Sequence, residues 1–482
     1  MSALAQAGGV AGSLGLAALM LGTRRAVRVS GFAAWVFGTG ALAAYLAPHQ
    51  HRGVLAGAAV VGLIAAAVGA AILVRWAWLL PFAALVVAPA RFPVHVGSTE
   101  ANLLLPLYAV VAAAALALAW ELPGEERHAR ELGPIAWPLA LWIGWTGLSI
   151  LWTRDLRQAA IELLFFVLPF GLLAVSLARL EWHRRAVVWL CGELALMGVV
   201  FAAIGIYQWA TRDIFWNPKL LVGNAYEPIY RVNSVFYDPS IYGRFLVVAI
   251  LASLAVVLAK PPQRVAVIVV AAIALTWVGL YYSYSQSSFA ALIVGVLVAS
   301  ALVWRRRALL GLGLALAVVV AIGLATPSVR HTVLSHTKSN WNSATSGRAS
   351  RVANGVHLAL DHPVVGVGVS SFKRAYADRL GLKGKEPKAA ASHDTPVTVA
   401  AETGIPGLAL LVWLIAAALV AAIRPGWRGL RGQAAAAFGI MVAAIVVHSL
   451  FYAALFEDPV FWGLLALIAV ASRPRAEPEA AT

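Results

Sequence analysis

Long apolar runs separated by short polar segments extend along the chain as far as residue 472. A run of about 17 to 25 apolar residues is long enough to cross a bilayer as a helix. Runs of this kind lie at 4–22, 30–48, 53–74, 76–90, 103–120, 135–152, 159–178, 186–209, 241–259, 265–282, 288–304, 308–326, 404–423, 434–456 and 459–472. Because the runs at 76–90 and 459–472 are short, the pattern predicts an all-α polytopic membrane protein with about 12–15 transmembrane helices.

Composition supports a membrane protein and argues against a nucleic-acid-binding one. Hydrophobic residues make up 61% of the 482 residues and charged residues only 12%, which is far from a soluble average. The formal net charge is +16, but the basic residues lie between the apolar runs and form no single patch or recognition helix. We therefore expect membrane lipids, and no nucleic acid, as partners.

Basic residues also predict the orientation of the helices, because Lys and Arg concentrate in short cytoplasmic loops. Alternate loops are rich in them, and we expect these loops to face the cytoplasm. They contain Arg24, Arg25 and Arg28; Arg75; Arg127 and Arg130; Arg179, Arg184 and Arg185; Lys260 and Arg264; Arg305, Arg306 and Arg307; Arg424, Arg428 and Arg431; Arg473 and Arg475. The intervening short loops hold only Arg52, Arg91, Arg154 and Arg157 and should face outward, which also puts the longer segments 210–240 and 327–403 outside.

This assignment divides the chain into six parts. They are N-terminal membrane helices (1–209), an external loop (210–240), central membrane helices (241–326), a large external loop (327–403), C-terminal membrane helices (404–472) and a cytoplasmic tail (473–482). The large loop has ten Lys or Arg against five Asp or Glu. Such a basic surface suits an anionic lipid head group or a diphosphate.

Two short helices are predicted inside the large loop. Apolar residues recur every three or four positions from Arg348 to Asp361, which indicates an amphipathic helix with Arg348 and Arg351 in its first turn. Their positions are Ala349, Val352, Val356 and Leu360. A second helix should begin near Pro396, with Asp394 or Thr395 as its cap, and end at Gly404 before Pro406 opens a membrane helix. His393 would then lie just before a helix N-terminus.

Three motifs in and near the external loops carry a resemblance to a known family. They are Arg231 in Arg-Val-Asn-Ser-Val-Phe-Tyr-Asp-Pro-Ser, Gly347-Arg348 followed by Pro363-Val-Val-Gly-Val-Gly, and Ser392-His393-Asp394 followed by Glu402-Thr-Gly-Ile-Pro-Gly. Over roughly residues 200–460 the chain resembles the O-antigen ligase/Wzy polymerase superfamily. The resemblance implies a membrane glycosyltransferase fold of the GT-C type. It also implies glycan transfer from an undecaprenyl-diphosphate carrier to a lipid or other envelope acceptor, outside the cytoplasmic membrane.

The resemblance also implies roles for individual residues. His393 would be the general base that takes a proton from the attacking sugar hydroxyl. Arg231 and Arg348 would bind the donor diphosphate, and Glu402 would orient His393 or the loop, with Asp394 as a second supporting residue. Ser288 stands where the family often has an arginine. Either Arg244, Arg351 or Arg374 supplies that charge, or this subgroup binds its donor differently.

Several alternatives stay open at this point. Arg231 could be an interfacial side chain that reaches toward water, and Arg244 could be structural, because a charge inside an apolar helix needs a cavity or a partner. His448 is interpreted as packed or hydrogen-bonded. We expect no cofactor and no metal, since the external segments lack Asp-x-Asp and Glu457-Asp458 stands alone. A Wzy-type polymerase, a transporter of an envelope precursor and a non-catalytic scaffold remain alternative functions.

Overall fold

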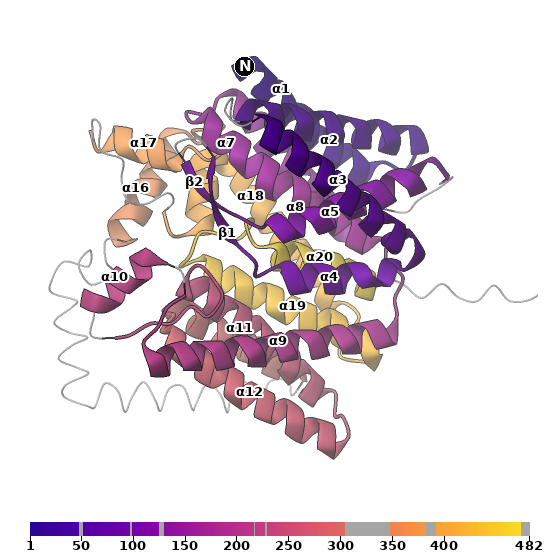
Figure 1. Cartoon of the computed structure of the whole chain (residues 1–482), viewed down its shortest axis with the longest axis vertical. Helices are drawn as coiled ribbons and strands as arrows, with labels where there is room; N and C mark the ends of the chain where they lie inside the picture. Colours follow the sequence, from indigo (N-terminus) through magenta and orange to yellow (C-terminus); the bar gives the residue numbers. More distant parts are fainter. Residues whose placement is uncertain are drawn as a thin grey trace, which may run out of the picture.

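Long helices lie roughly side by side in the computed structural model, and short helices gather at one end of them (Figure 1). The structure describes residues 1–47, 52–96, 99–124, 130–215, 217–226, 229–303, 348–381 and 392–473. The predicted membrane run at 308–326, Gly347 and most of the tail lie outside these residues.

The N-terminal half supplies eight helices and a small hairpin. The helices are α1 (Ser2–Leu21), α2 (Arg25–Leu46), α3 (Arg52–Arg75), α4 (Leu80–Val87), α5 (Leu105–Glu121), α6 (Ala136–Leu148), α7 (Leu156–Glu162) and α8 (Leu168–Ala178). The hairpin pairs β1 (Phe92–Val96) with β2 (Thr99–Leu103), with Phe92 opposite Leu103. A π-helical turn at Leu163–Val167 joins α7 to α8. Short 3-10 turns lie at Ala77–Leu79, Leu122–Gly124, Gly133–Ile135 and Ser149–Leu151.

The rest of the described chain is helical. Its helices are α9 (Arg184–Thr211), α10 (Pro218–Tyr226), α11 (Pro239–Leu258), α12 (Gln263–Ser283), Gln286–Val303, α16 (Arg348–Asp361), α17 (Phe372–Arg379), α18 (Thr395–Ile423), α19 (Gly429–Ser449) and α20 (Pro459–Ser472). The short helices α10, α16 and α17 lie at the same end of the bundle, at the left of Figure 1.

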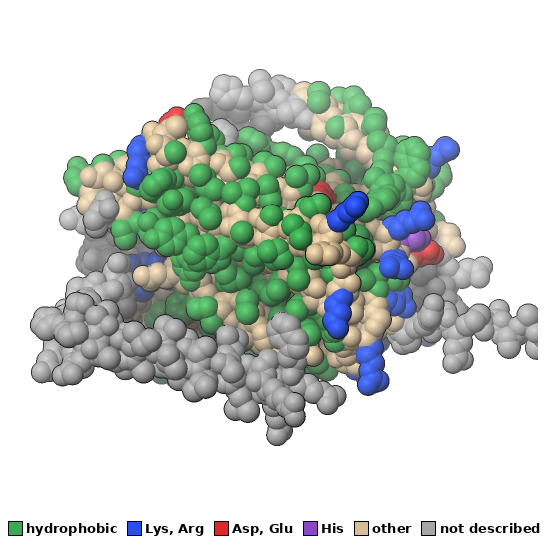
Figure 2. Space-filling model, turned by 90° about the horizontal axis from the view of Figure 1, so that it is seen from below, with side chains coloured by type: hydrophobic (Ala, Val, Ile, Leu, Met, Phe, Trp, Pro, Cys, Tyr) green, Lys and Arg blue, Asp and Glu red, His purple; other side chains and the backbone are tan. Residues whose placement is uncertain are grey.

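Within the described ranges, eleven helices are long and apolar enough to cross a membrane, or twelve if the bent pair α3 and α4 forms one span. The two halves of that pair meet at 115° around Arg75. The prediction of an all-α multi-pass membrane protein is confirmed, and the β1–β2 hairpin is a small addition to it. Figure 2 shows hydrophobic side chains over most of one face, with Lys and Arg gathered toward one edge.

Small residues allow the first two helices to pack closely. A Cβ atom built on Gly15 would lie 2.6 Å from the carbonyl oxygen of Gly31. Backbone contact of this kind is common between membrane helices, where packing and not the hydrophobic effect drives association. The glycines of α1 and α2 therefore serve helix packing.

The loops sort into two groups that match the alternation of basic residues. At one end, here called the paired arginine cluster, Arg28 lies 2.6 Å from Glu131, and Arg179 lies 2.8 Å from Glu121 and 3.3 Å from Glu131. Arg473 donates a hydrogen bond to the carbonyl oxygen of Glu131 at 2.6 Å. All these residues come from, or border, loops that the basic-residue pattern assigns to the cytoplasm.

Residues of the loops assigned to the outside meet at the other end. Arg91 donates to the carbonyl oxygen of Glu457 at 2.6 Å, and Trp152 donates to the carbonyl oxygen of Val365 at 3.0 Å. The contacts therefore group the loops as the sequence pattern does, and they place the large loop opposite the paired arginine cluster.

Candidate active site

His393 lies in a tight turn that immediately precedes α18. Its backbone φ is +67°, a left-handed conformation that is uncommon for residues other than glycine. Ser392 stabilises the turn, because its hydroxyl donates to the carbonyl oxygen of Asp394 at 2.7 Å and lies 2.9 Å from the hydroxyl of Thr398. The Asp394 carboxylate accepts a hydrogen bond from the Val397 N–H at 2.8 Å and so caps α18. The predicted helix start is confirmed, and the turn holds the imidazole at the end of this helix.

The electrostatic surroundings of His393 come from α16. Burial and then the guanidinium groups of Arg351 and Arg348 lower the pKa of His393 from 6.5 to about 4. Both effects disfavour the charged imidazolium. The imidazole is therefore neutral at pH 7 and able to accept a proton. Arg348 and His393, which the motifs selected, therefore act on one another, together with Arg351.

Glu402 supports the neighbouring loop. Its carboxylate accepts hydrogen bonds from the backbone N–H groups of Ser370 and Phe372, both at 3.0 Å. Phe372 is the first residue of α17, so the carboxyl group lies at a helix N-terminus, which favours its charged form. Burial acts against this and raises the pKa of Glu402 to about 7. Glu402 was expected to orient either His393 or the loop. Among the described residues, its hydrogen bonds go to the loop.

The backbone on either side of Glu402 is joined to the same loop. Val367 donates to the carbonyl oxygen of Ala401 at 2.9 Å, and Gly368 donates to that of Glu402 at 2.8 Å. Gly366 and Gly368 have φ values of +67° and +94°. A Cβ on Gly366 would collide with the Glu402 backbone, so the predicted close turn requires glycine here.

The segment after α6 also contacts this loop, and the sequence motifs did not select it. Thr153 donates to the carbonyl oxygen of Val369 at 2.8 Å, and its backbone leaves no room for a Cβ on Gly368. Trp145 donates to the carbonyl oxygen of Thr403 at 2.8 Å. In the sequence this segment appears only as a short polar stretch, next to tryptophans, between two apolar runs. Such a pattern is too common to identify a contact.

Arg231 lies near the position of the missing family arginine. Its Nε donates to the carbonyl oxygen of Ser283 at 3.1 Å, and Asn224 brackets its backbone with bonds of 2.9 and 3.1 Å. Ser283 ends α12, directly before the turn that leads to Ser288. Arg231 is thus held beside the turn that precedes Ser288. No contact between Arg231 and His393 is found among the described residues.

Arg244 has an acidic partner. Only 3% of its side chain is exposed, its Nε lies 2.9 Å from the Asp458 carboxylate, and its Nη1 donates to the carbonyl oxygen of Ala454 at 3.2 Å. The acid pair Glu457-Asp458, expected to stand alone, therefore binds arginine.

His448 is buried and its Nε2 lies 3.0 Å from the hydroxyl of Ser287, which agrees with a hydrogen-bonded residue.

Comparison with known proteins adds one match. Residues 271–412 match the family model described as O-antigen ligase. This segment includes Arg348, Arg351, His393 and Glu402, whereas Arg231 and Arg244 precede it. No curated protein matches the chain in sequence.

Proposed function

We propose that the chain is a glycosyltransferase of the O-antigen ligase type, because residues 271–412 match the O-antigen ligase family model. Its donor would be a glycan on undecaprenyl diphosphate. Its acceptor would be a hydroxyl of a lipid or another envelope molecule on the outer face of the cytoplasmic membrane. The apolar helices and the family match support a multi-pass membrane enzyme. The identities of the donor and the acceptor go beyond that support.

The proposed reaction is a single displacement at the anomeric carbon. The acceptor hydroxyl oxygen forms a bond to that carbon, and His393 takes the hydroxyl proton. The bond between the anomeric carbon and the diphosphate oxygen breaks, and the diphosphate leaves with the electron pair. Arg348 and Arg351 would bind this growing negative charge, because guanidinium groups pair with phosphate oxygens and stay protonated.

The observation that supports this mechanism best is that α16, which carries Arg348 and Arg351, packs against the first turn of α18, directly after His393. Burial, and after it the two cations, lower the pKa of the free imidazole. A bound diphosphate would neutralise the cations and remove the part of the lowering that they cause. The base would thus become stronger when the donor is in place.

Transfer by protein reconstituted in liposomes tests the proposal. The vesicles contain both a carrier-linked glycan donor and an acceptor with a free hydroxyl. In them, His393→Ala should lower the transfer rate by about 10²- to 10⁴-fold. His357→Ala is the matched control, because His357 is an exposed histidine on α16 and should retain the rate. Folding of both variants is checked by elution profile and thermal unfolding. Undiminished transfer by a folded His393→Ala protein would refute the mechanism.

Product length separates the two activities of the superfamily. A ligase moves the glycan to a new acceptor, whereas a polymerase lengthens a carrier-linked chain. Mass analysis of products made from one defined donor, with and without the acceptor, distinguishes them. Lengthened carrier-linked chains that form without acceptor would replace the ligase assignment by polymerase.

A further inference from the structure

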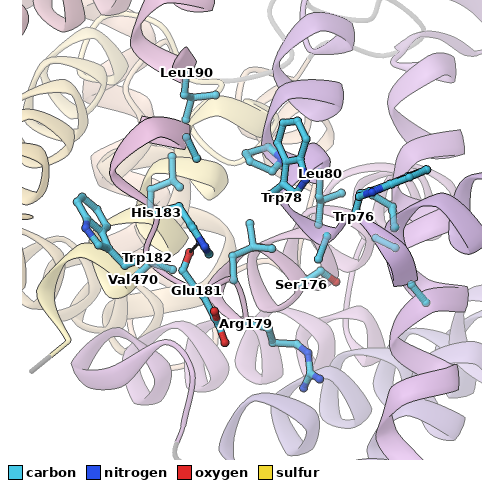
Figure 3. A pocket seen from close by; sticks show the side chains of 18 of the residues that line it. Trp76, Trp78, Leu80, Ser176, Arg179, Glu181, Trp182, His183, Leu190 and Val470 are labelled. Atoms are coloured by element: carbon cyan, nitrogen blue, oxygen red, sulfur yellow. Dashed lines mark hydrogen bonds between the residues drawn. The ribbon is translucent and has the colours of Figure 1, made fainter. Parts of the chain in front are cut away.

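A cavity of about 390 Å³ lies at the end of the bundle that holds the paired arginine cluster. Figure 3 shows Trp76 and Trp78 on one side of it and Trp182 and His183 on the other. The first pair belongs to the bend between α3 and α4, and the second to the connection between α8 and α9. The cavity thus opens where polar loops meet the apolar band.

The interior of this cavity is apolar and continues into the bundle. Its walls include Leu80, Leu118 and Leu190. A smaller cavity of about 70 Å³ shares further lining residues with it and extends along α4, α9 and α19, among almost wholly apolar side chains. The shared residues are Pro81, Leu190, Phe438 and Leu467. Together the two cavities form a channel suited to a hydrocarbon chain.

Two polar groups of the lining are available to a ligand. The hydroxyl of Ser176 is buried inside the cavity wall and has no hydrogen-bond partner in the described part of the chain. An unpaired buried hydroxyl is unfavourable, so a bound acceptor atom would be favourable there. Arg75 is exposed at the mouth, stacks on Trp76 at 5.3 Å and forms no ion pair among the described residues.

The other charged residues of the lining are Arg179, Glu121 and Glu181. Arg179, which also lines the cavity, is already paired with Glu121 and Glu131. Arg184 and Arg185 are exposed at the start of α9, next to His183 in the lining. A tryptophan-rich rim is typical of the membrane interface, and basic groups there attract anionic lipids.

We propose that this cavity binds an anionic phospholipid from the leaflet on the side of the paired arginine cluster. One acyl chain occupies the channel, the phosphate lies against Arg75, and an ester or glycerol oxygen accepts a hydrogen bond from Ser176. The site is at the end of the bundle opposite His393, so the proposal does not depend on glycan transfer.

Retention of lipid by the full-length protein in native mass spectrometry tests this site. After detergent extraction and addition of equal amounts of phosphatidylglycerol and phosphatidylcholine, the wild type should retain one phosphatidylglycerol. Ala186→Trp, which fills the cavity from α9, should abolish that retention. Val188→Trp is the control, because Val188 is 52% exposed and outside the lining, and should behave as the wild type.

A second pair of variants tests the head-group contact without filling the cavity. Arg75→Gln should lower phosphatidylglycerol retention about tenfold, the usual size of one charge-assisted contact, and leave phosphatidylcholine retention unchanged. Arg264→Gln, an exposed arginine outside the lining, should change neither. Equal retention of the two lipids by the wild type, or unchanged retention by a folded Ala186→Trp protein, would overturn the proposal.

Discussion

Arginines at the two ends of the bundle differ in what surrounds them. At one end Arg28 and Arg179 contact Glu131 and Glu121, so each cation has a matching carboxylate. At the other end Arg348 and Arg351 lie close enough to His393 to lower its pKa. An arginine paired with an acid stabilises the helices it joins, whereas cations placed beside a neutral base leave the site with a positive field that favours an anionic ligand.

Arg244 shows that the end of the bundle at which an arginine lies does not by itself determine whether that arginine is structural or binds a ligand. It lies with the outer group of loops, yet its pairing with Asp458 resembles the paired arginine cluster. Its neighbours therefore indicate a structural role, although the motif analysis grouped it with Arg231 and Arg348. The following changes test this distinction, beginning with the largest expected effect.

Removal of Arg244 should have the largest effect on stability. Arg244→Met leaves the Asp458 carboxylate buried without its partner, and breaking one side of a buried pair costs about 3–5 kcal/mol. The double variant Arg244→Met/Asp458→Leu should recover most of the loss, as measured by thermal unfolding in one detergent. If the double variant is stable but cannot transfer glycan, Arg244 belongs to the diphosphate site after all.

Loss of Glu402 should come next. Glu402→Ala removes the acceptor of two backbone N–H groups, and unsatisfied buried donors cost about 1–3 kcal/mol each. We expect a lower unfolding temperature and a strong fall in transfer, because the loop and the turn at His393 share the first part of α18. Asp378→Ala, which removes a side chain that is 61% exposed, is the control and should change little.

Neutralising the cations beside His393 should affect transfer and leave stability intact. Arg348→Gln and Arg351→Gln should each lower kcat/KM for the carrier-linked donor by about 10- to 100-fold, because each removes charge-assisted bonds to a phosphate. Arg379→Gln is the matched control, since Arg379 pairs with Asp361 on the same loop. Unchanged kcat/KM in both site variants would remove these arginines from the proposed site.

The smallest expected effect is a shift in the pH profile. The neutral form of His393 is the active one, so kcat/KM should persist below pH 6.5 and fall as the pH approaches about 4. Arg351→Gln removes a positive charge, raises the pKa of His393 and moves this acidic limb to higher pH, by about one unit or less. A profile that falls near pH 6.5 in the wild type and does not move in the variant would contradict the assigned environment.

Local signals predicted two of the helices described in the large loop, α16 and the first part of α18, and missed α17. Helix α16 spans Arg348–Asp361 as expected, and Asp394, Gly404 and Pro406 mark the start and the break of α18. Caps, prolines and glycines act within a few residues, so the sequence alone reveals them. The buried face of α16 was predicted only in part. Val356 and Leu360 are 42% and 66% exposed, whereas Leu358 is buried.

The features that could not be predicted from the sequence depend on contacts between segments far apart in the chain. A Cβ on Gly355 would lie 2.6 Å from Val397 and 3.0 Å from Phe372, so α18 and the start of α17 select which face of α16 is covered. The contact of Thr153 with the loop and the pairing of Arg244 with Asp458 likewise join residues far apart in the chain. Periodicity describes one element at a time and does not identify its partner.

The break in α18 relates the candidate base to the plane of the membrane. Gly404 has φ +71° and ψ −174°, so the chain changes direction there and continues as the membrane span through Pro406. The nine residues Thr395–Thr403 form a rigid arm of about 14 Å at 1.5 Å per residue. His393 precedes this arm by two residues, so the arm and the turn before it together limit how far the imidazole stands from the point where the span begins. The height of the base above the span is thus set by the protein's own helix.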